Sequence, residues 1–152
     1  MFFEDGKKYL VMGGSLMNKI AIGKRSEFYL WAKLLKSEID VFPSLVDDKG
    51  IDAIVGYSSR YYEVQVKSAQ NWTGQRGISF EKLQSNRRRL FIIYNYSKDE
   101  LRFFTSAQIL KEKAWSKSIK FDWAQIPLSK TLLKKYSKND YDGFIRFLKK
   151  KG

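Results

Sequence analysis

The order of apolar and polar residues predicts a β-hairpin in the first half of the chain. Two short runs rich in Val, Ile and Tyr flank Gly56–Arg60, a segment whose glycine and serines are typical of a hairpin turn. In the second run, residues 61–67, polar and apolar side chains alternate. Glu63, Gln65 and Lys67 therefore share one face of the predicted strand, and the valines between them lie on the other. A polar face on a core strand needs a reason.

The stretch before this hairpin has the periodicity of an amphipathic helix. Apolar residues recur at helical spacing up to position 35, and we expect this stripe to face the core. Its members are Ile20, Phe28, Trp31, Leu34 and Leu35. A strand over Ile39–Pro43 is expected next, and its proline indicates that the strand lies at the edge of a sheet or ends there.

Further elements follow in the second half of the chain. Leu90–Tyr96 is the strongest strand, and Leu101–Phe104 is its expected hairpin partner. Helical patterns and caps indicate four more helices, and one stretch alternates as an extended segment ending at a proline. The helices are expected over 78–84, 105–113 with Thr105 or Ser106 as cap, 128–136, and 140–150 with Asn139 as cap, and the extended segment over 119–126.

This order of elements predicts an α/β (α+β) fold, a mixed central β-sheet flanked by helices. The length of 152 residues suits a single domain. We expect its core to cover about residues 19–104 and a helical C-terminal extension to cover 105–152, and we assign no role to residues 1–18.

The composition limits the chemistry that the chain can perform. It contains no Cys and no His, which excludes disulfides, thiolate or imidazole zinc sites and Ser-His-Asp triads. Carboxylates, lysines, tyrosines and hydroxyls remain for catalysis. The sequence shows no apolar run of membrane-spanning length and no signal peptide, so a cytoplasmic protein is expected.

The net charge favours a polyanionic partner. The chain has 29 Lys and Arg against 16 Asp and Glu, a formal charge of +13. An excess of this size on a globular chain is typical of DNA-binding proteins, and a merely solubilising surface is the alternative.

The hairpin also carries a motif. Asp52 opens the first strand, and Gln65-Val66-Lys67 lies in the second. This pattern resembles the PD-(D/E)XK nuclease superfamily, in the Gln-X-Lys variant of its branch similar to Mrr-type restriction enzymes and Holliday-junction resolvases. The resemblance covers about Gly23–Phe104. It implies a restriction-endonuclease-like core.

The resemblance also implies a catalytic site. In that superfamily the first helix often carries a Glu that completes the metal site, and Glu27 is in the matching position; a role near the N-terminus of the helix is the alternative. Asp52, Glu27 and the amide oxygen of Gln65 would hold Mg²⁺ or Mn²⁺, since oxygen ligands select these ions. Lys67 would orient the attacking water or hold a phosphate oxygen. Asp47 and Asp48 are minor alternatives as ligands.

Several basic and aromatic residues are candidates for contacting nucleic acid. Trp72 lies in a polar loop after the motif and would stack on a strand or cover the sheet edge. The arginine triplet before Leu90 would clamp a phosphate or only form a solvated end. The candidates are Lys24, Arg25, Trp72, Gln75, Arg76, Arg87, Arg88 and Arg89.

Three interpretations of the function stay open at this point. The first is a metal-dependent DNA endonuclease of a restriction, repair or mobile-element system. The second is a catalytically silent nucleic-acid-binding module, because Gln65 removes one negative charge from the metal site. The third is a basic immunity or assembly protein. Many members of the superfamily act as dimers, so the resemblance also raises the expectation of a homodimer.

Overall fold

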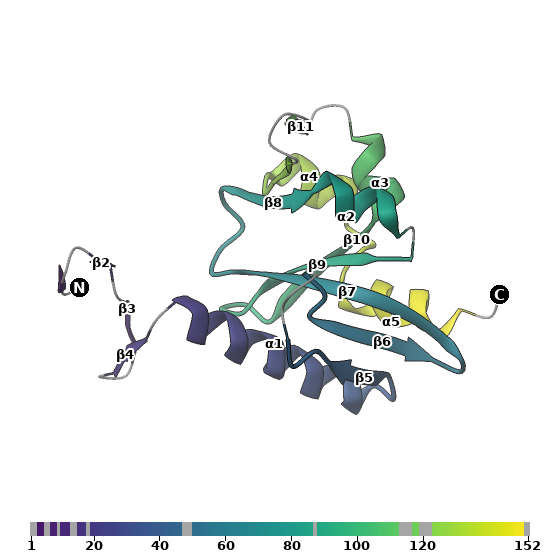
Figure 1. The fold of residues 1–152 in the computed structure, drawn as a ribbon, viewed down its shortest axis with the longest axis horizontal. Helices are drawn as coiled ribbons and strands as arrows, with labels where there is room; N and C mark the ends of the chain where they lie inside the picture. The colour runs from purple at the N-terminus through teal and green to yellow at the C-terminus, as the bar shows by residue number, and fades with distance from the viewer. Residues whose placement is uncertain are drawn as a thin grey trace.

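A mixed five-stranded sheet forms the centre of the molecule (Figure 1). The structure, a computed structural model, describes residues 3–4, 7–8, 10–12, 15–17, 19–46, 50–86, 88–112, 117–118 and 123–150. The strand order is β10-β9-β7-β6-β5, in which β7 and β9 run parallel and the other neighbours antiparallel. The strands are β5 (Asp40–Pro43), β6 (Ala53–Tyr57), β7 (Arg60–Ala69), β9 (Leu90–Asn95) and β10 (Glu100–Thr105). The predicted mixed sheet is confirmed.

The central hairpin β6–β7 is confirmed as well. Ser58 and Ser59 connect its strands, and both have positive φ, 48° and 70°. Two successive residues of positive φ are typical of the tight turns whose twist matches that of a hairpin. The edge position predicted from Pro43 is also correct, because β5 is the last strand of the sheet.

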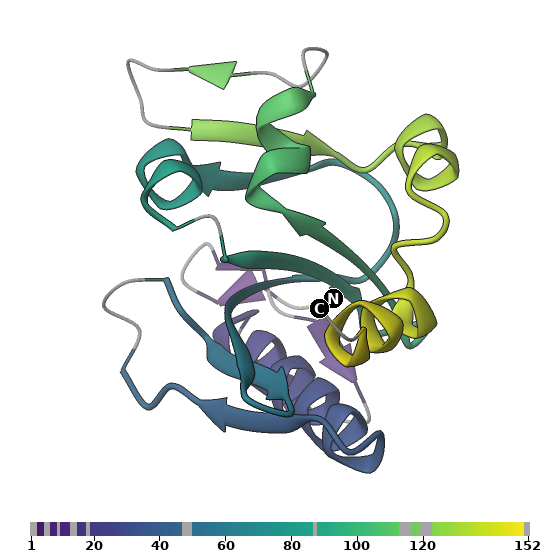
Figure 2. The same ribbon diagram turned by 90° about the vertical axis from the view of Figure 1, so that its right-hand side faces the viewer.

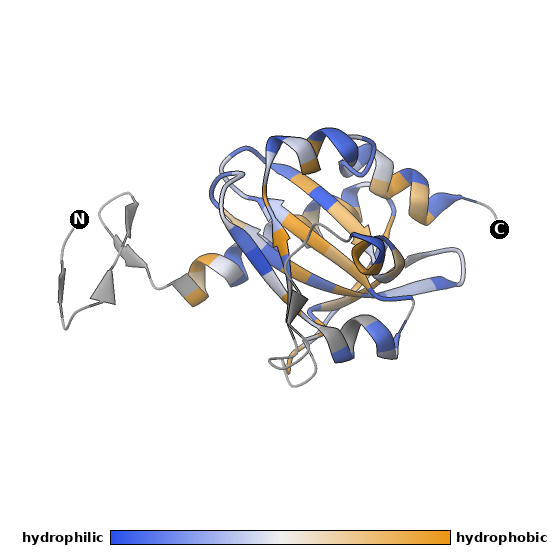
Figure 3. Cartoon of the chain, turned by 90° about the horizontal axis from the view of Figure 1, so that it is seen from above, coloured by the Kyte–Doolittle hydropathy of each residue, from blue (hydrophilic) through white to orange (hydrophobic). Residues whose placement is uncertain are grey.

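Two helices cover one face of this sheet (Figure 2). They are α1 (Lys19–Lys36) and α5 (Tyr141–Lys149). Leu30, Trp31 and Leu34 of α1 pack with the valines of β6 and β7, and α5 adds Phe144 and Leu148 to the same core. Figure 3 shows apolar residues concentrated on the central strands.

The predicted stripe of α1 is only half correct. Trp31 and Leu34 are buried, whereas Ile20, Phe28 and Leu35 are exposed. Residues 28 and 35 are seven apart and lie on one side of a helix, and that side faces away from the sheet. The helix therefore keeps an apolar strip on its outer surface.

A second layer covers part of the opposite face of the sheet. Its three strands, in the order β11-β12-β8, are β11 (Lys117–Ser118), β12 (Trp123–Pro127) and β8 (Gln75–Ser79). Its helices are α2 (Phe80–Ser85), α3 (Ser106–Lys111) and α4 (Lys130–Lys135). Phe91, Ile93 and Phe104 of the sheet pack against this layer. The C-terminal third thus does more than the predicted helical extension, since β12 pairs with β8 and α5 completes the main core.

Element boundaries differ from the prediction in two places. Ile78 and Ser79 end strand β8, so the helix predicted over 78–84 begins later. Asp140 caps α5 through the Gly143 N–H, whereas Asn139 bonds backbone atoms of β10. The predicted cap at Thr105 is confirmed, with a reciprocal capping box to Gln108.

The N-terminal residues contain two short antiparallel pairs. These are β1 (Phe3–Glu4) with β2 (Lys7–Lys8), and β3 (Leu10–Met12) with β4 (Ser15–Met17). In the part of the chain that the structure describes, no helix has the length and apolar character needed to cross a membrane.

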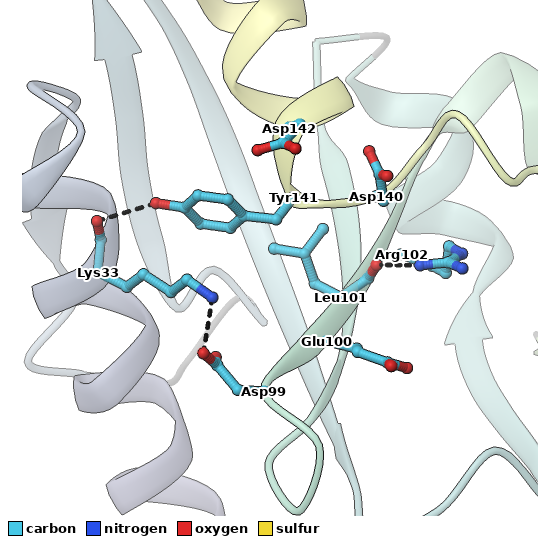
Figure 4. A pocket seen from close by; sticks show the side chains of 8 residues that line it. All are labelled: Lys33, Asp99, Glu100, Leu101, Arg102, Asp140, Tyr141 and Asp142. Atoms are coloured by element: carbon cyan, nitrogen blue, oxygen red, sulfur yellow. Dashed lines mark hydrogen bonds and ion pairs between the residues drawn. The ribbon is translucent and has the colours of Figure 1, made fainter.

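The Asp99 carboxylate joins α1 to the central sheet. Lys33 of α1 donates to Asp99 at 2.8 Å, and the Tyr94 hydroxyl of β9 donates to the same carboxylate at 2.8 Å. Tyr141 of α5 donates to the Lys33 carbonyl, which Figure 4 shows together with the ion pair. Partial burial raises the pKa of Asp99, but the hydrogen bonds from Lys33 and Tyr94 lower it more, so its pKa lies below the usual value.

We predict that Asp99→Asn lowers the free energy of unfolding at pH 7 by up to about 1 kcal/mol, because the side chain is 42% exposed and its ion pair is screened. A depressed pKa stabilises the folded chain above the unfolded value of about 3.9 and loses this effect as the pH falls through the folded value. Urea unfolding of both proteins should therefore converge below about pH 4. Asn tolerates the positive φ of 52° at this position.

The matched control is Glu38→Gln. Glu38 also has positive φ and pairs with Lys149 at 3.4 Å, but it is far more exposed. Its substitution should leave the free energy of unfolding at pH 7 unchanged. An equal loss in both variants would contradict the assignment to Asp99.

Candidate active site

The backbone of β7 holds the Asp52 side chain in place. The Val66 N–H donates to Asp52 Oδ2 at 2.6 Å, and the Asp52 N–H donates to the Val64 carbonyl at 2.8 Å. Ser44 extends the pairing with β5 by donating its N–H to the Asp52 carbonyl. The carboxylate is buried and lies at the junction of three strands.

A hydrogen bond brings Asp52 next to the Gln-X-Lys motif. The register of β6 against β7 begins with Ala53 opposite Val64, and the carboxylate of the preceding Asp52 accepts from the Val66 N–H, which lies between Gln65 and Lys67 along β7. Gln65 and Lys67 are two residues apart on one strand, so their side chains point to the same side of the sheet. The intervening valines lie on the other face, in the core with α1.

Gln65 provides the most informative atom of this site. The side chain is 7% exposed, and within the described residues its Oε1 is buried without a hydrogen-bond partner. An unpaired buried amide oxygen costs about 1–3 kcal/mol. A hard divalent cation is a group that such an oxygen binds, so the donor set fits the ion that the motif predicts.

The number of acidic ligands around such a cation is low. No group of three acidic or histidine side chains gathers anywhere in the described part of the chain. A cation beside Asp52 would therefore depend on amide and backbone oxygens as well as carboxylates.

Lys67 is half-buried on the same face. Among the residues that the structure describes, its ammonium forms neither an ion pair nor a hydrogen bond. A lysine of this kind keeps all three of its donors for a ligand.

Glu27 comes from a different layer. It lies on α1, one turn before Leu30 and Trp31, and its mostly buried carboxylate pairs with Lys24 at 2.8 Å. Helix α1 packs on the valine side of β7, whereas Gln65 and Lys67 project from the other side. The convergence of Glu27 with these residues stays a prediction.

Arg89 and Glu63 form an ion pair at the start of β9. The Arg89 Nε and Nη2 donate to one oxygen of Glu63 at 3.0 and 2.7 Å. The arginine is buried, and the register places Glu63 one strand period before Gln65. The Arg89 guanidinium therefore already pairs with Glu63, the acidic residue on the polar face of β7.

The other basic candidates have different surroundings. Arg25 and Arg88 are exposed, and Lys24 Nζ is held by Glu27. Arg87 lies outside the described residues, as do Asp47 and Asp48.

The loop after β7 closes the far end of the sheet. The Trp72 indole packs against the second core and donates to Glu100 at 2.8 Å, with the Arg102 guanidinium 5.7 Å from its ring. Arg76 donates to the carbonyls of Ser68 and Gln75, and its partial burial lowers the pKa. Gln75 is exposed at the start of β8. Of the two roles open for Trp72, covering the sheet edge is the one its contacts fit.

A surface pocket of about 380 Å³ lies between α1, β10 and α5 (Figure 4). It contains Lys33 and Asp99, which pair with each other, and none of the residues predicted for the site. It opens beside the turn after β9, whereas Gln65 lies next to the beginning of that strand. The pocket is therefore separate from the candidate site.

We predict opposite results for the two neighbouring arginines. Arg89→Ala should lower the free energy of unfolding by about 2–3 kcal/mol, because it leaves the Glu63 carboxylate without its partner. Arg88→Ala should change it by less than about 0.5 kcal/mol, since that side chain is exposed. Urea unfolding at neutral pH measures both values, and equal effects would contradict the placement of this ion pair.

The comparisons with known proteins concern the fold. No protein-family model matches the sequence, and no curated protein matches it. The Holliday junction resolvase Hjc of Archaeoglobus fulgidus is 14% identical with a TM-score of 0.51, over 70% of this chain and 84% of the resolvase. A nuclease from a fusselovirus is 19% identical with a TM-score of 0.50, over 84% of this chain and 98% of the nuclease. A bacterial homing endonuclease is 16% identical with a TM-score of 0.48, over 80% and 94%. By its likeness to the resolvase and the viral nuclease, the chain has the restriction-endonuclease-like fold that the motif predicts.

Proposed function

We propose that this chain is a metal-dependent endonuclease that hydrolyses phosphodiester bonds in DNA. One observation carries the proposal: Gln65, with its unpaired oxygen, and Lys67 share a face of β7, and the Asp52 carboxylate is bound to the Val66 N–H between them. The fold, shared with two nucleases, supports it. A formal charge of +13 suits a DNA substrate.

The residues of the site would divide the work as follows. A divalent cation such as Mg²⁺ or Mn²⁺, bound by Asp52 and Gln65, would stabilise the charge on phosphorus and supply hydroxide at neutral pH. The Val66 N–H keeps the Asp52 carboxylate in one orientation before substrate arrives. The Lys67 ammonium stabilises charge that develops on the phosphoryl oxygens and orients the attacking water.

A catalytically silent nucleic-acid-binding module is the second candidate. The observation that favours it is Gln65 itself, because an amide brings no charge to the cation. Both candidates bind DNA through basic residues such as Arg25 and Arg88, and only the first cleaves it.

We predict that Asp52→Asn and Lys67→Ala each reduce DNA cleavage with Mn²⁺ or Mg²⁺ by at least about 100-fold, because each removes a group that acts in the transition state. Cleavage of supercoiled plasmid and of branched and linear duplexes measures this effect. Glu38→Gln, a change at an exposed carboxylate that pairs with Lys149 and not with the candidate site, should cleave like the wild type.

The outcomes separate the two candidates. Cleavage that requires the cation and depends on both residues supports the endonuclease. Salt-sensitive DNA binding without any cleavage, unchanged by the two substitutions, supports the silent module.

We also predict that Gln65→Glu lowers the Mn²⁺ concentration for half-maximal cleavage by about tenfold, because it adds a negative charge next to the cation. Isothermal titration of Mn²⁺ into both proteins should show the same change. Gln65→Leu, which removes the oxygen, should weaken Mn²⁺ binding instead. Unchanged affinity in both variants would show that the side chain is not a ligand.

A further inference from the structure

Half of the sheet face that carries the candidate site is open. The second layer covers the β7–β9–β10 half, where Phe91, Ile93 and Phe104 are buried. The β5–β6 half has no such cover among the described residues, and Phe42 and Ile54 are 58% and 42% exposed there. These two residues are direct cross-strand partners and lie on one side of the sheet.

Tyr61 extends this open face from the next strand. Its ring lies over Gly56, where a Cβ atom would come within 2.4 Å of the ring carbon Cδ1. Its hydroxyl donates to Asp40 of β5 at 3.2 Å, and its ring meets Phe42 edge to face at 6.0 Å. The ring is thus held across the strands although it is 39% exposed. We call Phe42, Ile54 and Tyr61 the stacking face.

The register connects the stacking face to the candidate site. Ile54 follows Asp52 by two residues toward the hairpin turn, so about 7 Å separates their positions along the chain. Tyr61 and Gln65 lie on one side of β7. A ligand that extends from Asp52 toward the hairpin turn therefore meets the stacking face next.

We propose that the stacking face binds unpaired bases of the DNA substrate beside the cleavage site. Only unpaired bases present a free π-face, and exposed aromatic rings are the usual means of binding them. This inference rests on the proposed function and narrows its substrate class to DNA with single-stranded character, such as a flap, gap or free strand.

The charge of the chain favours this occupant over a second copy. A sheet face with three exposed apolar side chains suits self-association as well, but two chains of formal charge +13 repel each other, whereas DNA attracts each of them. A ring fixed by Gly56 and Asp40 also loses little freedom when a base stacks on it.

Binding without cleavage tests the stacking face. Fluorescence anisotropy in EDTA would compare oligothymidylate, an abasic strand and a blunt duplex, all of the same length. Phe42→Ala should weaken binding of oligothymidylate about tenfold, the usual effect of losing one stacking ring. Binding of the abasic strand and the duplex should change by less than about twofold, since neither offers a free base.

Two variants control for folding and for residue type. Phe28→Ala removes an equally exposed phenylalanine, 62% exposed on α1, and should bind all three ligands like the wild type. Tyr61→Phe keeps the ring and loses only the bond to Asp40, so it should bind oligothymidylate within about threefold of the wild type, whereas Tyr61→Ala should match Phe42→Ala. Circular dichroism confirms that each variant is folded.

Several results would overturn the inference. These are an unchanged affinity of Phe42→Ala for oligothymidylate, an equal loss for the duplex, or a dimer in sedimentation that Phe42→Ala dissociates. Crosslinking with an oligonucleotide that contains 5-iodouracil adds a test that needs no variant: crosslinks at Phe42 or Tyr61 support the stacking face, and crosslinks at Trp72 alone contradict it.

The proposed function can fail separately. Cleavage that depends on Asp52 combined with no base-dependent binding would leave the endonuclease and remove the stacking face. Base-dependent binding in EDTA without cleavage under any condition would leave the stacking face and remove the endonuclease.

Discussion

The hydrogen bond from the Val66 N–H to the Asp52 carboxylate is the interaction on which the candidate site depends. It fixes a charged side chain to the backbone of the strand that also carries Gln65 and Lys67. Because strand pairing sets the position of that backbone, the register of β6 against β7 determines the geometry of all three groups. A slip by one residue would turn Gln65 and Lys67 into the core and bring the valines to the site. The valines packed under α1 prevent such a slip, so the main hydrophobic core maintains the site on the opposite face.

The charges around this hairpin are largely compensated before any ligand binds. Arg89 neutralises Glu63, and Lys24 neutralises Glu27. Lys67 stands apart because, among the described residues, its ammonium has no partner. The buried, unpaired amide oxygen of Gln65 is costly for stability alone, and such groups are typical of sites that meet a ligand. In the proposed endonuclease, the Gln in place of an acid would reduce the negative charge available to a metal ion.

The second layer covers the sheet face on one side of this hairpin. Strands β8 and β12 with α3 and α4 bury the half of the sheet formed by β9 and β10. Gln65 lies at the boundary of the covered half, and Phe42 and Ile54 lie on the uncovered one. A site at such a boundary is buried enough to strengthen electrostatic interactions and open enough to admit a long polymer. The pocket between α1, β10 and α5 lies at the other end of β9 and serves packing through the Lys33–Asp99 pair.

Local patterns in the sequence were sufficient for the hairpin, the strands around it, the first helix and the Asp52 motif, because alternation and turn chemistry act between neighbouring residues. The mixed sheet followed from the order of these elements.

Other features depend on contacts between distant segments. The packing of the helices and of the second layer on the sheet sets three of these features. They are the ion pair of Arg89 with Glu63, the hydrogen bond of Trp72 to Glu100 and the exposure of Phe28. The unpaired oxygen of Gln65 and the exposure of the stacking face also depend on contacts between distant segments. The sequence by itself thus determined which groups share a face of β7, since the side-chain period of a strand is local; only the tertiary structure decided which of them already have partners, since partners come from other parts of the chain.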